Sequence, residues 1–128
     1  PDLGKYCEDN VNMVFTFEGG SIGTVEYLSN GDKTCPKEYL EIFAGGKIVQ
    51  LDDFRKLTLI EKNKRYMIKT VFRQDKGHAN SWKAFVDGIK TGKESPINFS
   101  EIWNVTQASF SAVRSLREQK SIQIDYFK

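Results

Sequence analysis

NVNMVFTFEGGSIGTVEYL, residues 10–28, decides the kind of fold that we expect for this chain. From Asn10 to Phe17 the apolar side chains fall on every second position, which is the period of a half-buried strand. The Gly19-Gly20 pair then indicates a tight turn, because glycine accepts the positive φ angles that short hairpins need. Ile22 to Leu28 is rich in β-branched and aromatic residues. The stretch therefore predicts a β-hairpin.

The same alternation of short apolar stretches and turn residues continues along the first half of the chain. Further strands are expected at 39–43, 47–51, 56–61 and 66–72, separated by turn signals at Asn30-Gly31-Asp32, Gly45-Gly46 and 52–55. Each turn connects neighbouring strands directly. We therefore expect one sheet, mainly an antiparallel meander.

After Gly77 the apolar period changes from that of a strand to that of a helix. One amphipathic helix is expected around Trp82–Ile89, and a longer one after Ser100, a suitable N-cap, with a final edge strand at 122–124. Strands followed by helices predict an α+β fold, an open antiparallel sheet with helices packed on one face. We expect residues 1–128 to form a single domain whose other sheet face needs a separate cover.

Composition excludes some classes of protein but does not identify this one. The 128 residues carry 19 basic and 17 acidic side chains, a formal charge of +2, so no single-sign field favours nucleic acid or a membrane surface. No apolar run is long enough to span a bilayer, and the first residues do not show the charged-then-apolar pattern of a leader, so we expect a soluble chain. We expect a cytoplasmic protein in which Cys7 and Cys35 are reduced, although one disulfide between them stays open. The start at Pro1 favours a fragment of a longer protein.

Motifs of a complete enzyme are missing from the sequence. It has neither GxGxxG nor GxxxxGK[ST], and its single histidine excludes the common clustered metal sites. That residue, His78, has two interpretations: a helix-entry residue bonded to backbone, or a polar group at the mouth of a substrate pocket. Asp52 and Asp53 are adjacent and would point to opposite faces of a strand, so we interpret them as turn formers.

A polar cluster stands out at one predicted turn: Asn30, Asp32, Lys33 and Lys37. It is compatible with a solvated loop, and equally with a loop that presents hydrogen-bond donors to the hydroxyl groups or a carboxylate of a substrate.

The order of several motifs resembles the C-terminal domain of Gfo/Idh/MocA oxidoreductases. The resemblance is carried along nearly the whole chain by GSIGTVEY (20–27), NGDK (30–33) with PKE (36–38), LDDFR (51–55), KGH (76–78) and the long helix ending in SLR (115–117). The NGDK and PKE segments are similar to those of members fused behind a medium-chain, alcohol-dehydrogenase-like half.

This resemblance implies a parent enzyme that transfers hydride between NAD or NADP and a hydroxyl-bearing carbon of a sugar, cyclitol or nucleotide sugar. The Rossmann domain and the catalytic lysine and histidine would lie upstream of Pro1, and His78 does not stand in the context of that histidine. For this chain the resemblance implies substrate contacts and a homo-oligomeric interface through the free sheet face. The expected substrate-binding residues are Asn30, Asp32, Lys33, Lys37 and His78, with Arg55 as a weaker addition.

Two other functions remain open. A stand-alone ligand-binding or oligomerisation module could use the same scaffold without catalysis. A small hydrolase would require a nucleophile and an acidic partner within hydrogen-bond reach of His78.

Overall fold

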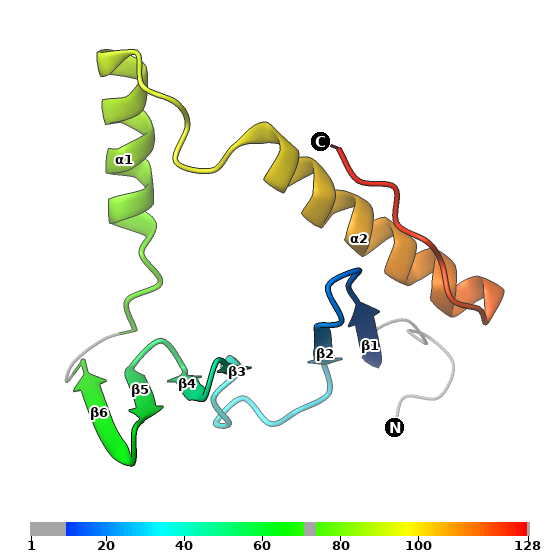
Figure 1. The fold of residues 1–128 in the computed structure, drawn as a ribbon, viewed down its shortest axis with the longest axis horizontal. Coiled ribbons are helices and arrows are strands. Elements are labelled where there is room, and N and C mark those ends of the chain that lie inside the picture. Colours follow the sequence, from blue (N-terminus) through cyan, green and yellow to red (C-terminus); the bar gives the residue numbers. More distant parts are fainter. Residues whose placement is uncertain (1–9, 71–73, 128) are drawn as a thin grey trace. The chain divides into compact units, whose positions relative to one another are not determined.

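The computed structural model describes residues 10–70 and 74–127, which form six strands and two helices (Figure 1). The elements in chain order are β1 (Asn10–Thr16), β2 (Ile22–Leu28), β3 (Tyr39–Ala44), β4 (Lys47–Asp52), β5 (Lys56–Glu61), β6 (Lys64–Lys69), α1 (His78–Thr91) and α2 (Phe99–Glu118). All strand pairs are antiparallel, which confirms the α+β prediction. The described residues group into two compact units: unit 1 joins the part up to Gly31 with the part from Gly92 onward, and unit 2 is Asp32–Thr91.

Unit 1 contains the predicted hairpin. β1 and β2 pair from Asn10 opposite Leu28 to Thr16 opposite Ile22. Gly20 has a φ of 81°, and its amide donates to the carbonyl of Phe17 at 2.9 Å. The turn therefore depends on the conformational freedom of glycine, as the sequence indicated.

Helix α2 begins earlier than expected. Asn98, not Ser100, is its N-cap: the Asn98 side-chain oxygen accepts from the amide of Glu101 at 2.8 Å. Ser100 lies within the first turn, where its hydroxyl donates to the same oxygen at 2.7 Å. The prediction was wrong because asparagine and serine are both good caps, and spacing alone does not choose between them.

The chain that follows α2 runs back along this helix (Figure 1). The Asn104 amide pairs with the Phe127 backbone, accepting from its N–H at 2.7 Å and donating to its carbonyl at 3.2 Å. Phe99 and Trp103 contact the Phe127 ring, with centroids 5.7 and 6.1 Å away. The edge strand expected at 122–124 is absent. A side chain and an aromatic cluster, instead of a neighbouring strand, hold this segment.

Unit 2 contains a four-stranded meander in the order β3-β4-β5-β6. Its three connections place consecutive residues at positive φ: Gly45-Gly46, Asp53-Phe54 and Lys62-Asn63. Such residues form the type I′ turns whose twist matches that of adjacent strands. The single expected sheet is instead two sheets, because β2 pairs with β1 alone and a proline-containing loop separates it from β3.

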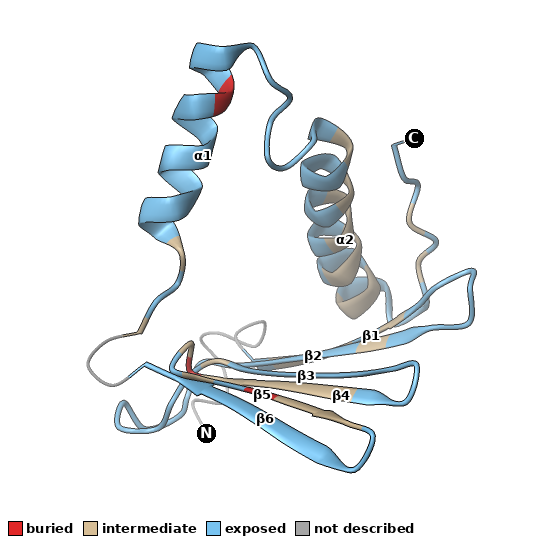
Figure 2. Cartoon of the chain, turned by 60° about the vertical axis from the view of Figure 1, so that its left-hand side comes forward, coloured by how far each residue is buried: buried red, intermediate tan, exposed pale blue. Residues whose placement is uncertain are grey.

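The pairing register gives the meander two chemically different faces, since directly opposite residues point to the same side. One, the apolar face, carries Leu40, Ile42, Val49, Leu51, Leu57, Leu59, Tyr66 and Ile68, with the charged Lys47, Glu61 and Lys64 at one end. The other, the mixed face, combines apolar side chains with Glu41, Gln50, Asp52, Lys56, Thr58, Arg65 and Lys69. The central strands are half-buried and the outer strands are exposed (Figure 2).

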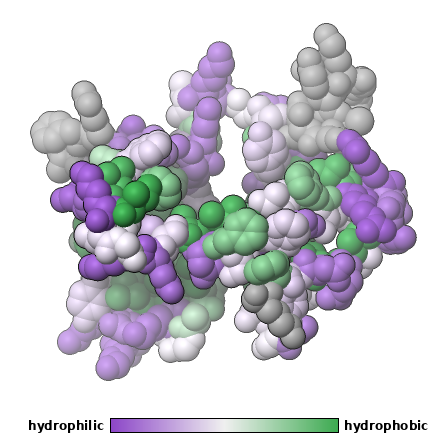
Figure 3. Space-filling view, turned by 90° about the horizontal axis from the view of Figure 1, so that it is seen from above, coloured by the Kyte–Doolittle hydropathy of each residue, from purple (hydrophilic) through white to green (hydrophobic). Residues whose placement is uncertain are grey.

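Apolar side chains of both units remain accessible. Among the described residues no hydrophobic side chain is fully buried, and hydrophobic patches reach the surface (Figure 3). The most extensive contacts between described elements join consecutive strands. Helix α1 accordingly exposes Trp82, Phe85 and Ile89. Amphipathic elements need an apolar partner, so these faces are available for contacts outside their own unit.

Candidate functional site

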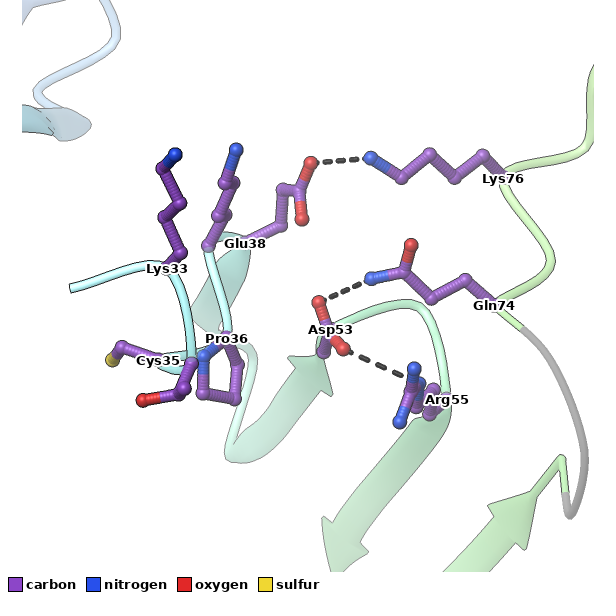
Figure 4. Close-up of a pocket in the computed structure, with 10 residues that line it drawn as sticks. Lys33, Cys35, Pro36, Glu38, Asp53, Arg55, Gln74 and Lys76 are labelled. Carbon is purple, nitrogen blue, oxygen red and sulfur yellow. Dashed lines mark hydrogen bonds and ion pairs between the residues drawn. The ribbon is translucent and has the colours of Figure 1, made fainter. Parts of the chain in front are cut away.

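A polar hollow of about 410 Å³ opens in unit 2. Its lining comes from three segments: the loop before β3, the turn between β4 and β5, and the segment that leads into α1 (Figure 4). The lining residues are Lys33, Thr34, Cys35, Pro36, Lys37, Glu38, Asp53, Arg55, Gln74 and Lys76. We call this cavity, together with its lining residues, the polar hollow.

The β4–β5 turn places Asp53 in the polar hollow. Asp53 and Phe54 have φ angles of 50° and 51°, and the Arg55 amide closes the turn by donating to the Asp52 carbonyl at 2.9 Å. The Asp53 amide also donates to the carbonyl of Glu38 at 2.8 Å. Aspartate tolerates the left-handed region better than most residues, so the turn and the position of this carboxylate are determined together.

The carboxylate of Asp53 organises its neighbours. One oxygen lies 3.3 Å from Nε of Arg55, and the other accepts a hydrogen bond from the Gln74 side chain (Figure 4). The residue is only 8% exposed. Because both oxygens already have partners, Asp53 is suited to positioning Arg55 and Gln74 and less suited to meeting a ligand directly.

Lys76 joins the segment before α1 to the loop before β3. Its ammonium group lies 2.5 Å from Oε1 of Glu38 and 5.6 Å from the centre of the Phe54 ring. The hydrogen bond from Lys76 is the main cause that lowers the pKa of Glu38, with smaller contributions from the charges of Lys76 and Lys37. The Asp75 amide donates to the Phe54 carbonyl at 3.2 Å, which fixes the same segment through the backbone.

Asp32 shapes the loop that carries the two lysines. Its Oδ1 accepts from the Thr34 amide at 2.8 Å and from the Thr34 hydroxyl at 2.6 Å, and its carbonyl accepts from the Cys35 amide at 3.1 Å. The hydroxyl hydrogen bond and then the amide hydrogen bond lower the pKa of Asp32. This is an aspartate turn in which the carboxylate serves its own loop.

The structure brings together some of the predicted substrate-binding residues. Lys33, Lys37 and the weaker candidate Arg55 line the polar hollow. Asp32 lies beside the lining without belonging to it, and Asn30 falls in unit 1. His78 is the first residue of α1 and does not line the polar hollow.

Sequence reasoning missed Glu38, Asp53, Gln74 and Lys76 as members of this site. The pairs that they form join residues 21 and 38 positions apart. No local periodicity reports such pairs. The one available signal was that NGDK, PKE, LDDFR and KGH all carried the resemblance. It indicated that these segments serve a common function, but not that they lie close together in space.

The lining of the polar hollow consists mainly of charged and hydrogen-bonding side chains. Within residues 10–70 and 74–127, no group of three or more His, Cys, Asp or Glu side chains could hold a metal ion. Cys35 is exposed with a free thiol, whereas Cys7 lies outside the described residues. Cationic and amide donors dominate the lining, and such groups recognise hydroxyls and anions.

Comparisons with known proteins identify no relative of this chain. No protein-family model matches it, and no curated protein or solved structure does so either. Neither described helix has the length and apolar character needed to cross a bilayer.

Proposed function

We propose that this chain is the C-terminal domain of an NAD(P)-dependent oxidoreductase that acts on a hydroxyl of a sugar, cyclitol or nucleotide sugar. In this proposal the chain supplies substrate contacts and the interface between subunits. A ligand-binding module without catalysis is the alternative.

One observation carries the proposal. Four separate segments that resemble the Gfo/Idh/MocA domain, namely NGDK, PKE, LDDFR and KGH, each contribute at least one residue to the polar hollow. They contribute Lys33 from NGDK, Pro36, Lys37 and Glu38 from PKE, Asp53 and Arg55 from LDDFR, and Lys76 from KGH. The antiparallel register brings these segments to one end of the meander, where Tyr39 lies opposite Asp52 and Lys56 opposite Lys69. The polar and charged residues that they place there support a shared role in binding substrate.

The nicotinamide cofactor does not fit the residues of this chain. A dinucleotide needs a glycine-rich turn at a helix N-terminus to receive its pyrophosphate, and GxGxxG is absent from the sequence. The proposal therefore assigns the cofactor to a Rossmann domain elsewhere in the parent protein. It assigns to this chain the orientation of the substrate hydroxyls through Arg55, Gln74 and the loop lysines.

The apolar face supports the second part of the proposal. Leu40, Ile42 and Ile68 on this face are 50%, 46% and 68% exposed. A contiguous apolar surface of this kind marks an interaction site. A second copy of the same chain offers the same apolar surface around a two-fold axis, as isologous dimers do.

The test uses the full-length protein and follows nicotinamide absorbance with NAD and NADP against a panel of sugars, cyclitols and nucleotide sugars. Asp53→Asn removes the charge that holds Arg55 and Gln74 and keeps the shape of the turn. We expect the KM for the sugar to rise several-fold while the KM for the nicotinamide is unchanged. The matched control is Glu61→Gln, which breaks the 3.0 Å pair with Lys47 outside the polar hollow. Absence of hydride transfer with every substrate would leave the binding module as the function.

A further inference from the structure

The charges of the polar hollow do not cancel. Its lining holds four cationic side chains and two carboxylates, a formal excess of two positive charges. Both carboxylates are already engaged, Glu38 by Lys76 at 2.5 Å and Asp53 by Arg55 at 3.3 Å. Lys33 and Lys37 form no ion pair with any carboxylate in the described part of the chain. The two loop lysines thus remain available to an anionic ligand.

Hydrogen bonds within the loop order the turn next to these lysines. The hydrogen bonds between Asp32 and Thr34 close its turn at 2.6 and 2.8 Å, and Pro36 restricts the backbone between the lysines. A loop that is ordered before binding loses less conformational entropy when a ligand arrives. Gln74 and Lys76 reach in from the side opposite the loop of Lys33 (Figure 4).

We propose that the polar hollow binds the phosphate group of a phosphorylated sugar or polyol, with Lys33 and Lys37 as its cationic partners. Ammonium groups bind phosphate as point charges, and a phosphate dianion matches the excess of two positive charges. The volume of about 410 Å³ lies in the range of sites for small molecules, which leaves room for a sugar beside the phosphate. Arg55 and Gln74 then face its hydroxyls.

A phosphate site here would make a phosphorylated sugar or polyol the substrate of the proposed oxidoreductase, and its role in catalysis rests on that proposed function. Phosphate binding itself can be measured without turnover. The probe is inorganic phosphate, titrated at a fixed ionic strength of about 0.15 M into the isotope-labelled intact protein while the backbone amides of residues 33–38 are followed by NMR. Acetate is the comparison probe, because a carboxylate on a sugar acid would also be attracted to lysines.

The expected result is saturable binding of phosphate, with acetate at least about tenfold weaker because its single charge gains about half of the Coulomb attraction. The double variant Lys33→Gln/Lys37→Gln should lose at least about tenfold in phosphate affinity. The control Lys56→Gln/Lys69→Gln removes the same charge from the mixed face, where these two residues lie opposite each other. We expect it to stay within about twofold of the parent protein, since screened charges outside the site act weakly.

A further variant tests whether phosphate affinity follows the charge of the lining. Glu38→Gln removes a negative charge from the lining and should tighten phosphate binding by about two- to fivefold. Equal losses in the two lysine double variants would overturn the site, because the attraction would then be a property of the whole surface. Equal affinities for acetate and phosphate would overturn the assignment to phosphate.

Failure of this inference is separable from failure of the proposed function. If the full-length protein oxidises a phosphorylated sugar with the same kcat/KM in the Lys33→Gln/Lys37→Gln variant as in the parent protein, the oxidoreductase stands and the phosphate site falls. If phosphate binds through these lysines but no substrate is turned over, the phosphate site stands and the oxidoreductase falls.

Discussion

If the apolar face forms the proposed subunit interface, replacement of Ile68 by lysine should weaken self-association through it. Full burial of an isoleucine side chain contributes about 1.5–3 kcal/mol, and Ile68 is 68% exposed, so covering it in a dimer contributes about 1–2 kcal/mol per subunit. A two-fold interface contains the residue twice, which gives about 2–4 kcal/mol for the dimer. At about 1.4 kcal/mol per factor of ten, Ile68→Lys should raise the dimer Kd by between about 30-fold and 700-fold.

The neighbouring residue provides the matched control. Met67 lies on the same strand, is 44% exposed and points to the mixed face, because successive side chains of a strand alternate. Met67→Lys introduces the same charge and should change the dimer Kd by less than about threefold. Sedimentation equilibrium over a range of protein concentrations measures both constants, and far-UV circular dichroism checks that β6 is retained. An unchanged Kd for Ile68→Lys, or an equal rise for both variants, would refute the interface.

Three further changes test the local structure. Gly46→Ala should cost about 1–2 kcal/mol in urea unfolding because its φ is 74°, whereas Gly31→Ala, with open space and no positive φ, should cost less than about half of that. Asn98→Ala should destabilise α2 by about 1 kcal/mol, seen as faster amide hydrogen exchange in its first turn. Lys76→Met should raise the pKa of Glu38 towards its ordinary value in an NMR titration, since the Lys76 hydrogen bond is what mainly lowers it. In the parent protein this hydrogen bond stabilises the fold fully above the ordinary glutamate pKa, and its contribution is lost as the pH falls through the lowered pKa of Glu38. An unchanged titration of Glu38 in Lys76→Met would contradict the pairing.

Local signals in the sequence were sufficient to predict the six strands and the two helices of the described residues, although not every boundary. The β1–β2 hairpin follows from alternation and a glycine pair, and the Gly45-Gly46 turn follows from the positive φ that only glycine adopts freely. These features depend on residues within a few positions of one another. Where two local solutions were equally good, as for Asn98 and Ser100, the sequence did not decide between them.

Longer-range arrangement was predicted less well. The alternation of strands gave no sign that the meander would break between β2 and β3, because each strand has the same local pattern whichever neighbour it pairs with. The segment at 122–124 has the composition of an edge strand, yet its chain is held by Asn104 and an aromatic cluster. A strand requires an available edge as well as a suitable sequence.

The polar hollow illustrates why composition is a weak guide to a site. A net charge of +2 over 128 residues predicted no single-sign field on the scale of the chain. The same formal excess arises among the ten residues that line the polar hollow, where Glu38 and Asp53 pair with Lys76 and Arg55. Within residues 10–70 and 74–127, Lys33 and Lys37 form no ion pair with a carboxylate. Coulomb attraction acts over the distance to a bound ligand, and salt screens it beyond about 10 Å. The affinity of a site for an anion therefore depends on which carboxylates the fold has already paired, and that is a property of the structure.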